Sequence, residues 1–435
     1  MIGIRQPLNI ALERLRNRSL LRKVVENAGW QMAPKLLRAL VGLLVGVWVA
    51  RYLGPKGFGA LNFAIAFTAL FFPLAQLGLQ TIVVRDLVRH PERRVEILSS
   101  AIVLRLAGTG ISIALFVGCS LLLRPGDMAS LEMAVAVGLS FIAQAWDIID
   151  YDYQARMMPA PITITRSAGL ITFAAVKVIL ILVHAPVICF ALAISGEATL
   201  CALVFRYLAR GLRLASATRA QMVELLRDSW PVAIAALSVI LYMQIDQVML
   251  GQMAGYRAVG IFSAAVRVSQ SWLFVPMAAV AAAAPALTAA HQRSEQDYNR
   301  QLLAVVRSLF WMAVIAAVLI SSLSREIVAF LYGARYRESG TVLAIHAWAG
   351  IFATLGLSSG AWFVNAGLLK LRMLNTSAGA VVNCSLNLYA IPHFGVVGAA
   401  VSTLVSYAIA GFLMNAFDPR SRVIFRMQCR SLIFR

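Results

Sequence analysis

The sequence contains few charged residues, and acidic residues are the scarcest. Of its 435 residues 13% are charged, with 19 acids against 39 Lys and Arg, which gives a net charge of +20. Soluble domains carry about a quarter charged residues. This chain is instead 60% hydrophobic, with a mean hydropathy of +0.78. The scarcity of charge excludes an ordinary soluble domain and indicates an integral membrane protein.

The excess of basic residues does not indicate a nucleic-acid partner. Basic side chains cluster in short segments between apolar runs, and they are not interleaved with aromatic residues on a polar surface. This distribution is typical of membrane topology and of attraction to anionic lipid. We therefore expect membrane lipid, and no nucleic acid, among the partners.

Motifs of enzymatic chemistry are also scarce. The sequence has no G-x-x-x-x-G-K-[ST] motif for ATP and no H-E-x-x-H motif for zinc. Asp150 and Asp152 form a D-x-D pattern like that of metal-assisted sugar transferases, but so short a pattern arises by chance. We interpret it as a solvated helix end or part of a gate. No two of the five cysteines have metal-ligand spacing. We predict no catalytic site, no metal site and no cofactor.

Long apolar runs fill most of the chain. A membrane-spanning helix needs about 20 apolar residues, and we predict twelve such helices. They cover residues 30–53, 59–84, 97–123, 130–150, 161–184, 186–208, 229–252, 258–290, 301–323, 340–366, 371–392 and 395–417. No connecting loop exceeds about twenty residues. The fold class is therefore an all-α polytopic membrane protein.

Polar segments divide the twelve helices into two sets of six. A basic arm at 1–28 and a basic tail at 418–435 flank the spans. An amphipathic linker at 209–228, which suits the inner membrane surface, separates a six-helix bundle at 29–208 from another at 229–417. Basic residues concentrate on one side of this arrangement, so both termini are expected in the cytoplasm.

The two halves of the sequence have tryptophan and glycine residues at corresponding positions. Trp30 and Trp230 open them, and Gly59 and Gly260 follow at comparable spacing. Six helices return the chain to its starting side, so we predict a parallel repeat about an axis along the membrane normal. One basic segment, 325–337, falls on the outer side. Its alternating basic and apolar residues predict a short helix at the membrane interface.

Two segments resemble a known family. RYLGPKGFGALNFAIAF, which begins at Arg51, and IDQVMLGQMAGYRAVGIFSAAVRVSQSWLFVP, which begins at Ile245, are similar to sequences of one group of flippases. These are the polysaccharide-transport members (O-antigen and exopolysaccharide flippases) of the multidrug/oligosaccharidyl-lipid/polysaccharide exporter superfamily. The resemblance covers essentially the whole chain in length, span count and order. It implies a MATE-like, V-shaped pair of six-helix bundles around a central cavity.

The resemblance also implies a function. Members of the family carry an undecaprenyl-pyrophosphate-linked oligosaccharide across the bacterial inner membrane by alternating access, for lipopolysaccharide or exopolysaccharide synthesis. We expect ion-gradient coupling and a polysaccharide polymerase or assembly protein as a partner. Related members export drugs or flip the peptidoglycan precursor, and these remain alternatives. A polytopic glycan polymerase or transferase is a further alternative, which the short loops disfavour.

Basic residues inside the predicted spans fit an anionic cargo. A charge in a lipid-exposed position costs a few kcal/mol or more, and the planar fork of arginine suits phosphate oxygens. We predict a cavity lined by the deeper basic residues and two glutamines: Arg38, Arg105, Lys177, Arg267, Gln144 and Gln270. Lys35, Arg166 and Arg307 lie near span ends and are interpreted as snorkelling to the interface. A cation exporter should instead concentrate acids in its cavity.

Four acids in or beside the spans are candidates for coupling or gating. They are Asp246, Glu197, Asp147 and Asp150. Asp246 either pairs with a nearby base or is a carboxyl whose protonation couples transport to an ion gradient. Both interpretations of Asp246 fit the sequence.

Overall fold

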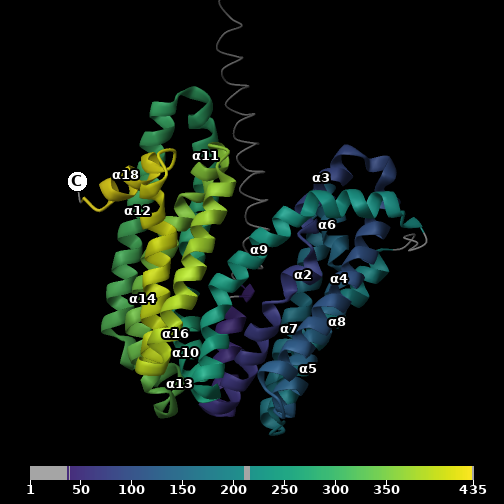
Figure 1. Cartoon of the computed structure of the whole chain (residues 1–435), viewed down its shortest axis with the longest axis vertical. Helices are drawn as coiled ribbons and strands as arrows, with labels where there is room; N and C mark the ends of the chain where they lie inside the picture. Colours follow the sequence, from purple (N-terminus) through teal and green to yellow (C-terminus); the bar gives the residue numbers. More distant parts are fainter. Residues whose placement is uncertain (1–36, 39, 210–215, 434–435) are drawn as a thin grey trace, which may run out of the picture.

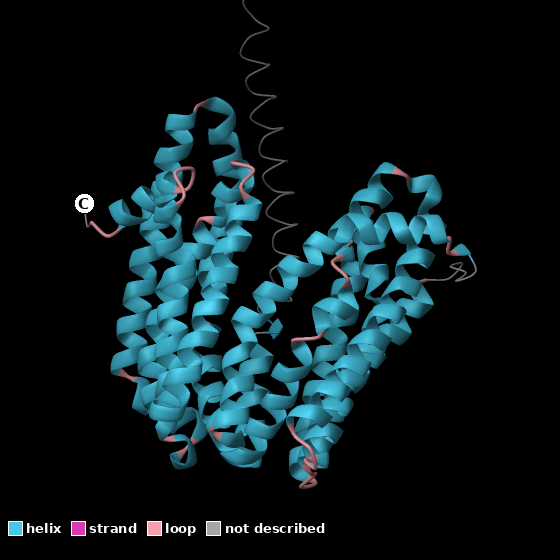
Figure 2. Ribbon diagram, in the orientation of Figure 1, coloured by secondary structure: helices cyan, strands magenta, loops and turns pink. Residues whose placement is uncertain are grey.

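A computed structural model describes residues 37–38, 40–209 and 216–433 of this chain, and these residues are almost entirely helical. Figure 2 shows helices joined by short loops, with no strand in the described ranges. The predicted arm at 1–28 lies outside the described residues, as does most of the first half of the predicted linker. The boundaries drawn at 28, 208, 228 and 417 therefore stay predictions.

The first half begins with the helical segment Leu40–Ala69. It continues with α2 (Phe72–Gln76), α3 (Leu79–Arg89), α4 (Arg94–Leu123), α5 (Met128–Gln144), α6 (Ile148–Ala155), α7 (Ala160–Leu182) and α8 (Val187–Leu208). A single turn of 3-10 helix, η2 (Ala145–Asp147), joins α5 to α6.

The second half begins with α9 (Arg219–Met253). It continues with α10 (Gly255–Ser271), α11 (Phe274–Arg293), α12 (Glu295–Ser322), α13 (Ser324–Tyr332), the 3-10 turn η4 (Ala334–Tyr336), α14 (Glu338–Ser358) and α15 (Gly360–Asn365). The chain ends with α16 (Leu369–Ala408), the π-helix η5 (Ile409–Leu413), α17 (Met414–Phe417) and α18 (Arg422–Ser431). Helix α13 lies where the sequence predicts a short helix at 325–337.

Two glycines with positive φ interrupt long helices, and these breaks divide the described helices into twelve spans. By length and hydropathy, nine described helices are long enough to cross a membrane, or ten with the bent pair Leu40–Ala69 and Phe72–Arg89. Two of these ten are interrupted: Gly54 has φ 65° and Gly395 has φ 57°, values that an α-helix does not contain. When each side of these two breaks is counted separately, the predicted all-α fold with twelve spans is confirmed.

The helices form two arms that converge at one end and diverge at the other (Figure 1). Helices α4, α5, α7 and α8 run in one arm, and α12, α14 and α16 run in the other. Helix α9 connects them, because its first turns pack on α2, α3 and α4 while its remainder packs on α10 and α16. We call the diverging side, where α3 and α18 lie, the open end, and the opposite side the closed end.

The described part of the predicted linker is continuous with a span. Thr218 caps α9 by accepting a hydrogen bond from the amide of Gln221 (3.3 Å). The first turns of α9 then bury Gln221, Leu225 and Ser229, which are spaced four residues apart, against the first arm. The amphipathic pattern between 219 and 228 therefore reflects packing on protein along one face of a long helix.

The two halves touch backbone to backbone at the closed end. A Cβ atom on Gly59 would lie 1.7 Å from the carbonyl oxygen of Tyr256, and one on Gly260 would lie 2.0 Å from the carbonyl oxygen of Pro55. Real Cβ atoms do not approach backbone so closely, so only glycine fits at either position. The glycines that mark corresponding places in the two halves of the sequence thus form the crossing point of the two halves.

Hydrogen bonds to carbonyl oxygens reinforce this contact. Arg51, at the end of the first span, donates from Nε to the carbonyl of Leu331 (2.6 Å) and from Nη2 to that of Phe330. In the other direction, the buried hydroxyl of Tyr336 donates to the carbonyl of Ala50 (2.8 Å). The carbonyls at the end of α13 have no partner within that helix, so the first half satisfies groups of the second.

A second group of contacts surrounds Arg124, in the loop before α5. Its side chain donates to Gln252 (3.0 Å), to the Tyr256 hydroxyl and to the Gly251 carbonyl, all in the second half. The Tyr256 hydroxyl donates in turn to Asp127 (2.7 Å). Burial raises the pKa of Asp127, but hydrogen bonds from Tyr256, from a backbone amide and from Arg124 outweigh burial and leave this pKa below its ordinary value. Asp127 is therefore ionised at neutral pH and holds both partners.

The glycine contact predicts a large effect of one methyl group. Gly59→Ala places a methyl carbon against a backbone carbonyl that cannot move independently, so we expect a loss of about 3 kcal/mol or more. Gly118→Ala is the control, since Gly118 lies in α4 and a Cβ added there would have no atom within 4 Å; it should be neutral or stabilising by up to about 1 kcal/mol. Thermal unfolding in detergent measures both. Similar stability of the two variants would contradict the described contact.

Candidate functional site: a cationic cavity between the halves

A cavity of about 500 Å³ lies between the two halves, on the open-end side of the glycine contact. The first two spans, α7 and α8 of the first half and α9 and α10 of the second half contribute its walls. Apolar side chains make up much of the lining. Its polar side chains include three cations and three glutamines: Arg38, Lys177, Arg267, Gln244, Gln247 and Gln270.

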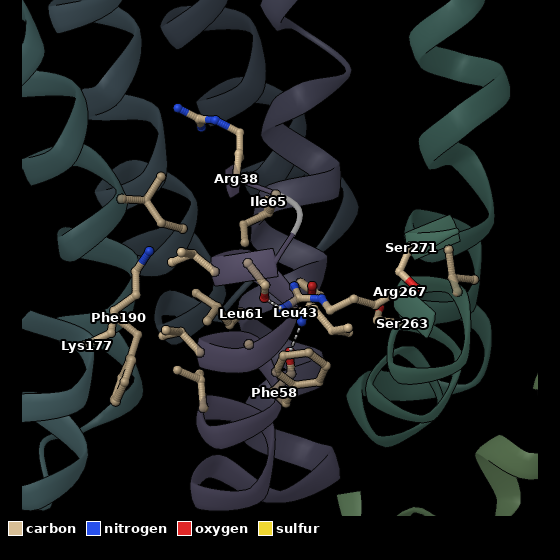
Figure 3. A pocket seen from close by; sticks show the side chains of 18 of the residues that line it. Arg38, Leu43, Phe58, Leu61, Ile65, Lys177, Phe190, Ser263, Arg267 and Ser271 are labelled. Carbon is tan, nitrogen blue, oxygen red and sulfur yellow. Dashed lines mark hydrogen bonds between the residues drawn. The ribbon is translucent and has the colours of Figure 1, made fainter. Parts of the chain in front are cut away.

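Arg267 reaches across the cavity from the second half. Figure 3 shows its side chain extending from α10 toward Leu43 and Phe58 of the first half. Its Nη1 donates to the carbonyl of Gly42 (3.4 Å), and its guanidinium lies 5.2 Å from the centre of the Phe58 ring, within cation–π range. Gly46 makes this position possible, because a Cβ there would lie 1.8 Å from Nη1 of Arg267.

The two cations of the first half share one carboxylate. Glu197 on α8 lies 3.7 Å from Nη1 of Arg38 and 3.9 Å from Nζ of Lys177. Both distances exceed those of direct charge-assisted hydrogen bonds, so these ion pairs are loose. Arg267 has no ion pair with any carboxylate in the described part of the chain. Among the described residues, the three cations that line the cavity and Glu197 beside them leave an excess of two positive charges.

Four of the six predicted cavity residues line this cavity: Arg38, Lys177, Arg267 and Gln270. The other two lie elsewhere. Arg105 is only 1% exposed inside the first half, where its Nη1 donates to the Tyr151 hydroxyl (3.0 Å). Gln144 donates to Ser140 (3.1 Å), one turn earlier on its own helix. Hydropathy places a residue along a span but does not reveal which face of the helix it occupies.

The cavity also contains polar residues that the sequence alone does not assign to it. An amide within a span more often makes helix–helix contacts, yet Gln244 and Gln247 both line the cavity. They form a chain in which Ser263 donates to Gln247 (2.9 Å) and Gln247 donates to Gln244 (3.1 Å). Asn62 also lines the cavity, and its position as an amide within an apolar run is the only sequence signal for it.

Asp147 and Asp150 belong to an ion-pair network within the first half. Arg166 lies 3.3 Å from Asp147 and 2.9 Å from Asp150. Arg166 therefore pairs with acids of the bundle, a partnership that its position near a span end does not reveal. The two acids flank the junction of η2 and α6, where the helix that contains them changes form. These acids are placed to affect the relative position of α6 and α7.

The D-x-D pattern does not converge on one point. Asp150 faces Arg166, whereas Asp152 accepts hydrogen bonds from Nε and Nη2 of Arg94 (2.7 and 2.8 Å) and lies 3.1 Å from Arg156. The two carboxylates thus engage different arginines on different helices. The interpretation of the pattern as a solvated helix end is wrong for Asp152, which is buried and held by these ion pairs.

Asp246 lies in a second polar cluster, inside the second half. It is 4% exposed and accepts hydrogen bonds from Nδ2 of Asn387 (2.6 Å) and from the hydroxyl of Thr403 (2.9 Å). Asn387 also donates to Asn383 (3.0 Å). No described base forms an ion pair with Asp246, so the interpretation as one member of a pair has no support. Gln247, the next residue on α9, faces the cavity.

One segment has the pattern of a serine-hydrolase motif but not its structural context. Gly356-Leu-Ser-Ser-Gly360 has the form G-x-S-x-G, but Ser358 is buried at the end of α14 and donates to the carbonyl of Leu355 (3.0 Å). A nucleophilic serine of this motif sits on a sharp turn between a strand and a helix, with its hydroxyl exposed. The helical context here matches neither requirement.

The amino-acid sequence of this chain matches a known protein family. Residues 24–291 match the model of a family described as "Polysaccharide biosynthesis protein". This chain belongs to that family. The match covers more than half of the chain and agrees with the resemblance that the two quoted segments carry. No curated protein matches the chain.

Solved structures share the fold of this polysaccharide biosynthesis protein. The lipid II flippase MurJ in an inward closed conformation is 16% identical, covers 92% of this chain and 90% of its own, and has a TM-score of 0.72. An inward-facing MATE family multidrug resistance transporter of the MOP superfamily is 16% identical over 91% of this chain and 94% of its own, with a TM-score of 0.69. A MOP superfamily transporter from Pyrococcus furiosus is 15% identical over 94% and 95%, with a TM-score of 0.64. The predicted MATE-like architecture is confirmed.

The Asp246 cluster predicts a graded response to substitution. Asp246→Ala leaves one amide hydrogen of Asn387 without its acceptor, at a cost of about 1–3 kcal/mol for this buried group, whereas the Thr403 hydroxyl can still donate to the carbonyl of Ala399 (2.9 Å). Asp246→Asn keeps one acceptor oxygen and should cost less. Glu326→Ala, which removes an exposed acid from α13, is the control and should leave stability unchanged. Thermal unfolding of the purified variants gives the order; equal stability of both Asp246 variants and the control would contradict the described hydrogen bonds.

Proposed function

We propose that this protein is a flippase that carries an undecaprenyl-pyrophosphate-linked oligosaccharide across the bacterial inner membrane for O-antigen or exopolysaccharide synthesis. The excess of two positive charges in the cavity between the halves is the observation that carries the proposal. A pyrophosphate diester bears two negative charges, which match this excess. Membership of the polysaccharide biosynthesis family supports a glycan cargo.

Each polar group of the cavity has a role in this proposal. Arg267 binds the pyrophosphate from the second half, and Arg38 and Lys177 bind it from the first half. The anion displaces Glu197 from its loose ion pairs with these two cations. The glutamines Gln244, Gln247 and Gln270 offer both donors and acceptors to sugar hydroxyls. An anion held from both halves links their movements.

The distribution of arginines supports an orientation with the open end in the cytoplasm. Arg85 and Arg89 of α3 lie at that end, as do the arginines of α18. Cytoplasmic segments carry such an excess of basic residues. In this orientation the cavity opens toward the side on which lipid-linked precursors are made, and the closed end faces the periplasm.

Asp246 is the proposed coupling residue. It is a buried carboxylate without a basic partner in the described residues, on the helix whose other face lines the cavity. Binding of a proton or a monovalent cation at Asp246 changes its hydrogen bonds to Asn387 and Thr403, and both lie on α16, on opposite sides of the Gly395 break. A change at that break tilts α9 relative to α16. In this proposal the energy input acts on the same helix, α9, that contributes Gln244 and Gln247 to the cavity.

The second candidate cargo is the peptidoglycan precursor. MurJ, a lipid II flippase, shares the fold over nine-tenths of both chains, and this similarity favours the alternative. Lipid II also joins a sugar to a polyprenyl chain through pyrophosphate, so the cationic cavity accepts either cargo. The sugar part distinguishes them, and only transport with both substrates separates the two proposals.

A reconstituted transport assay tests the proposed function. Proteoliposomes are loaded with an undecaprenyl-pyrophosphate oligosaccharide or with lipid II, and the appearance of headgroup on the opposite side is followed. We expect the oligosaccharide to be transported. Arg267→Ala should slow transport by about ten- to a hundredfold, the value of a charge-assisted hydrogen bond. Arg267→Lys should fall between, because it keeps the charge without the planar fork.

The matched control is Arg325→Ala, which removes an exposed arginine at the closed end. It should transport like the wild type. Transport of lipid II alone would support the second cargo. Equal rates for Arg267→Ala and the control would contradict the role of the cavity cations. Absence of transport of either lipid, together with export of small organic cations, would overturn the proposed function.

A further inference from the structure

The helix α18 has one face fixed to the protein and one face free. Its buried face consists of Ile424, Met427, Gln428 and Ser431, which pack on α12 and on the end of the last span. Gln428 holds this face against the neighbouring helices, because its side chain donates a hydrogen bond to Ser359 (3.0 Å) and accepts one from Asn415 (3.1 Å). These buried hydrogen bonds fix the rotation of α18 about its axis and thereby determine which residues face outward.

The outward face carries three arginines. Arg422, Arg426 and Arg430 are exposed and spaced four residues apart, so they fall within an arc of about 80° on a helix that turns about 100° per residue. None of the three forms an ion pair with a carboxylate in the part of the chain that the structure describes. The nearest acid in the sequence, Asp418, is engaged by Arg420 (2.9 Å). Arg422 also donates from Nε to the carbonyl of Ala416 (3.1 Å), so none of the three charges is neutralised by an ion pair with a described carboxylate.

Both ends of α18 are tied to membrane-spanning helices. Four residues separate its first residue from Phe417, where the last span ends, so the five Cα–Cα steps between them span at most about 18 Å. At its other end, Nη2 of Arg307 on α12 donates to the carbonyl of Arg430 (3.4 Å). Figure 1 shows α18 on the outer side of its arm, across the direction of the spans. The arginines are thus held beside the end of the last span, at the open end.

We propose that the arginine face of α18, formed by Arg422, Arg426 and Arg430, is a binding surface for the headgroups of anionic phospholipids in the surrounding leaflet. The phosphate oxygens of these lipids accept hydrogen bonds from guanidinium groups, and the surface potential of the leaflet attracts each charge. Exposed apolar residues adjoin the face, namely Val423, Leu432 and Ile433. Such residues pack at the boundary between headgroups and acyl chains.

This surface is separate from the cavity and does not depend on the proposed cargo. It anchors the end of one arm in the leaflet at the open end, where the two arms diverge (Figure 1). A rigid helix with a fixed arginine face gives that arm a preferred position relative to the membrane surface. The composition of the leaflet then affects this arm directly.

Lipid retention tests the proposal. The purified full chain is equilibrated in mixed micelles with equimolar phosphatidylglycerol and phosphatidylcholine, and native mass spectrometry measures the ratio of the two lipids retained. The variant carrying Arg422→Gln, Arg426→Gln and Arg430→Gln should lower this ratio by more than about tenfold, since each arginine near a charged surface is worth about fivefold. Raising the salt concentration should reduce the difference between wild type and variant.

A charge-matched variant is the control. Arg325→Gln, Arg335→Gln and Arg337→Gln together remove three exposed arginines at the closed end. This variant should retain phosphatidylglycerol like the wild type, and thermal unfolding checks that both variants fold. An unchanged ratio in the α18 variant would overturn the proposal. So would an equal loss in the two variants, because the effect would then reflect net charge alone and not this face.

Discussion

The backbone contact between Gly59 and Gly260 is the constraint on which the rest of the structure depends. Two helices from different halves cross so closely there that neither position has room for a Cβ atom. Such a crossing fixes where the halves meet, since small residues let helix backbones approach closely. The hydrogen bonds of Arg51 and Arg124 then hold the closed end together. The cavity exists because the halves diverge from this point.

The cost of buried charge explains the composition of the cavity. Cations inside a membrane are stable only with partners or water. Glu197 partly neutralises two of them, whereas Arg267 contacts a carbonyl and an aromatic ring and has no ion pair among the described residues. A cavity with this excess of positive charge favours any anion that reaches it. The described cations lie in both halves, so an anion bound in the cavity would contact both.

The sequence predicts the helices well because apolar runs and helix-breaking glycines depend on neighbouring residues in the chain. The breaks at Gly54 and Gly395 fall at the predicted boundaries between spans, and Arg267, Lys177 and Arg38 lie in the cavity as expected. The sequence does not predict which face of a helix a side chain occupies. Arg105 is as deep as Arg267 but faces the interior of its bundle, because the hydroxyl of Tyr151 lies there. The partners of Asp246 are more than a hundred residues away, so no local pattern identifies them.

We propose that the two halves rock about the glycine contact when an anion binds between them. Paired spin labels in a background without the five native cysteines test it by electron–electron distance measurements. Val88 and Arg293 report on the open end, and the highly exposed Leu122 and Phe330 report on the closed end. With a lipid-linked pyrophosphate added, we predict a shorter distance at the open end and a longer one at the closed end. Distances that stay constant, or that change in the same direction at both ends, would contradict it.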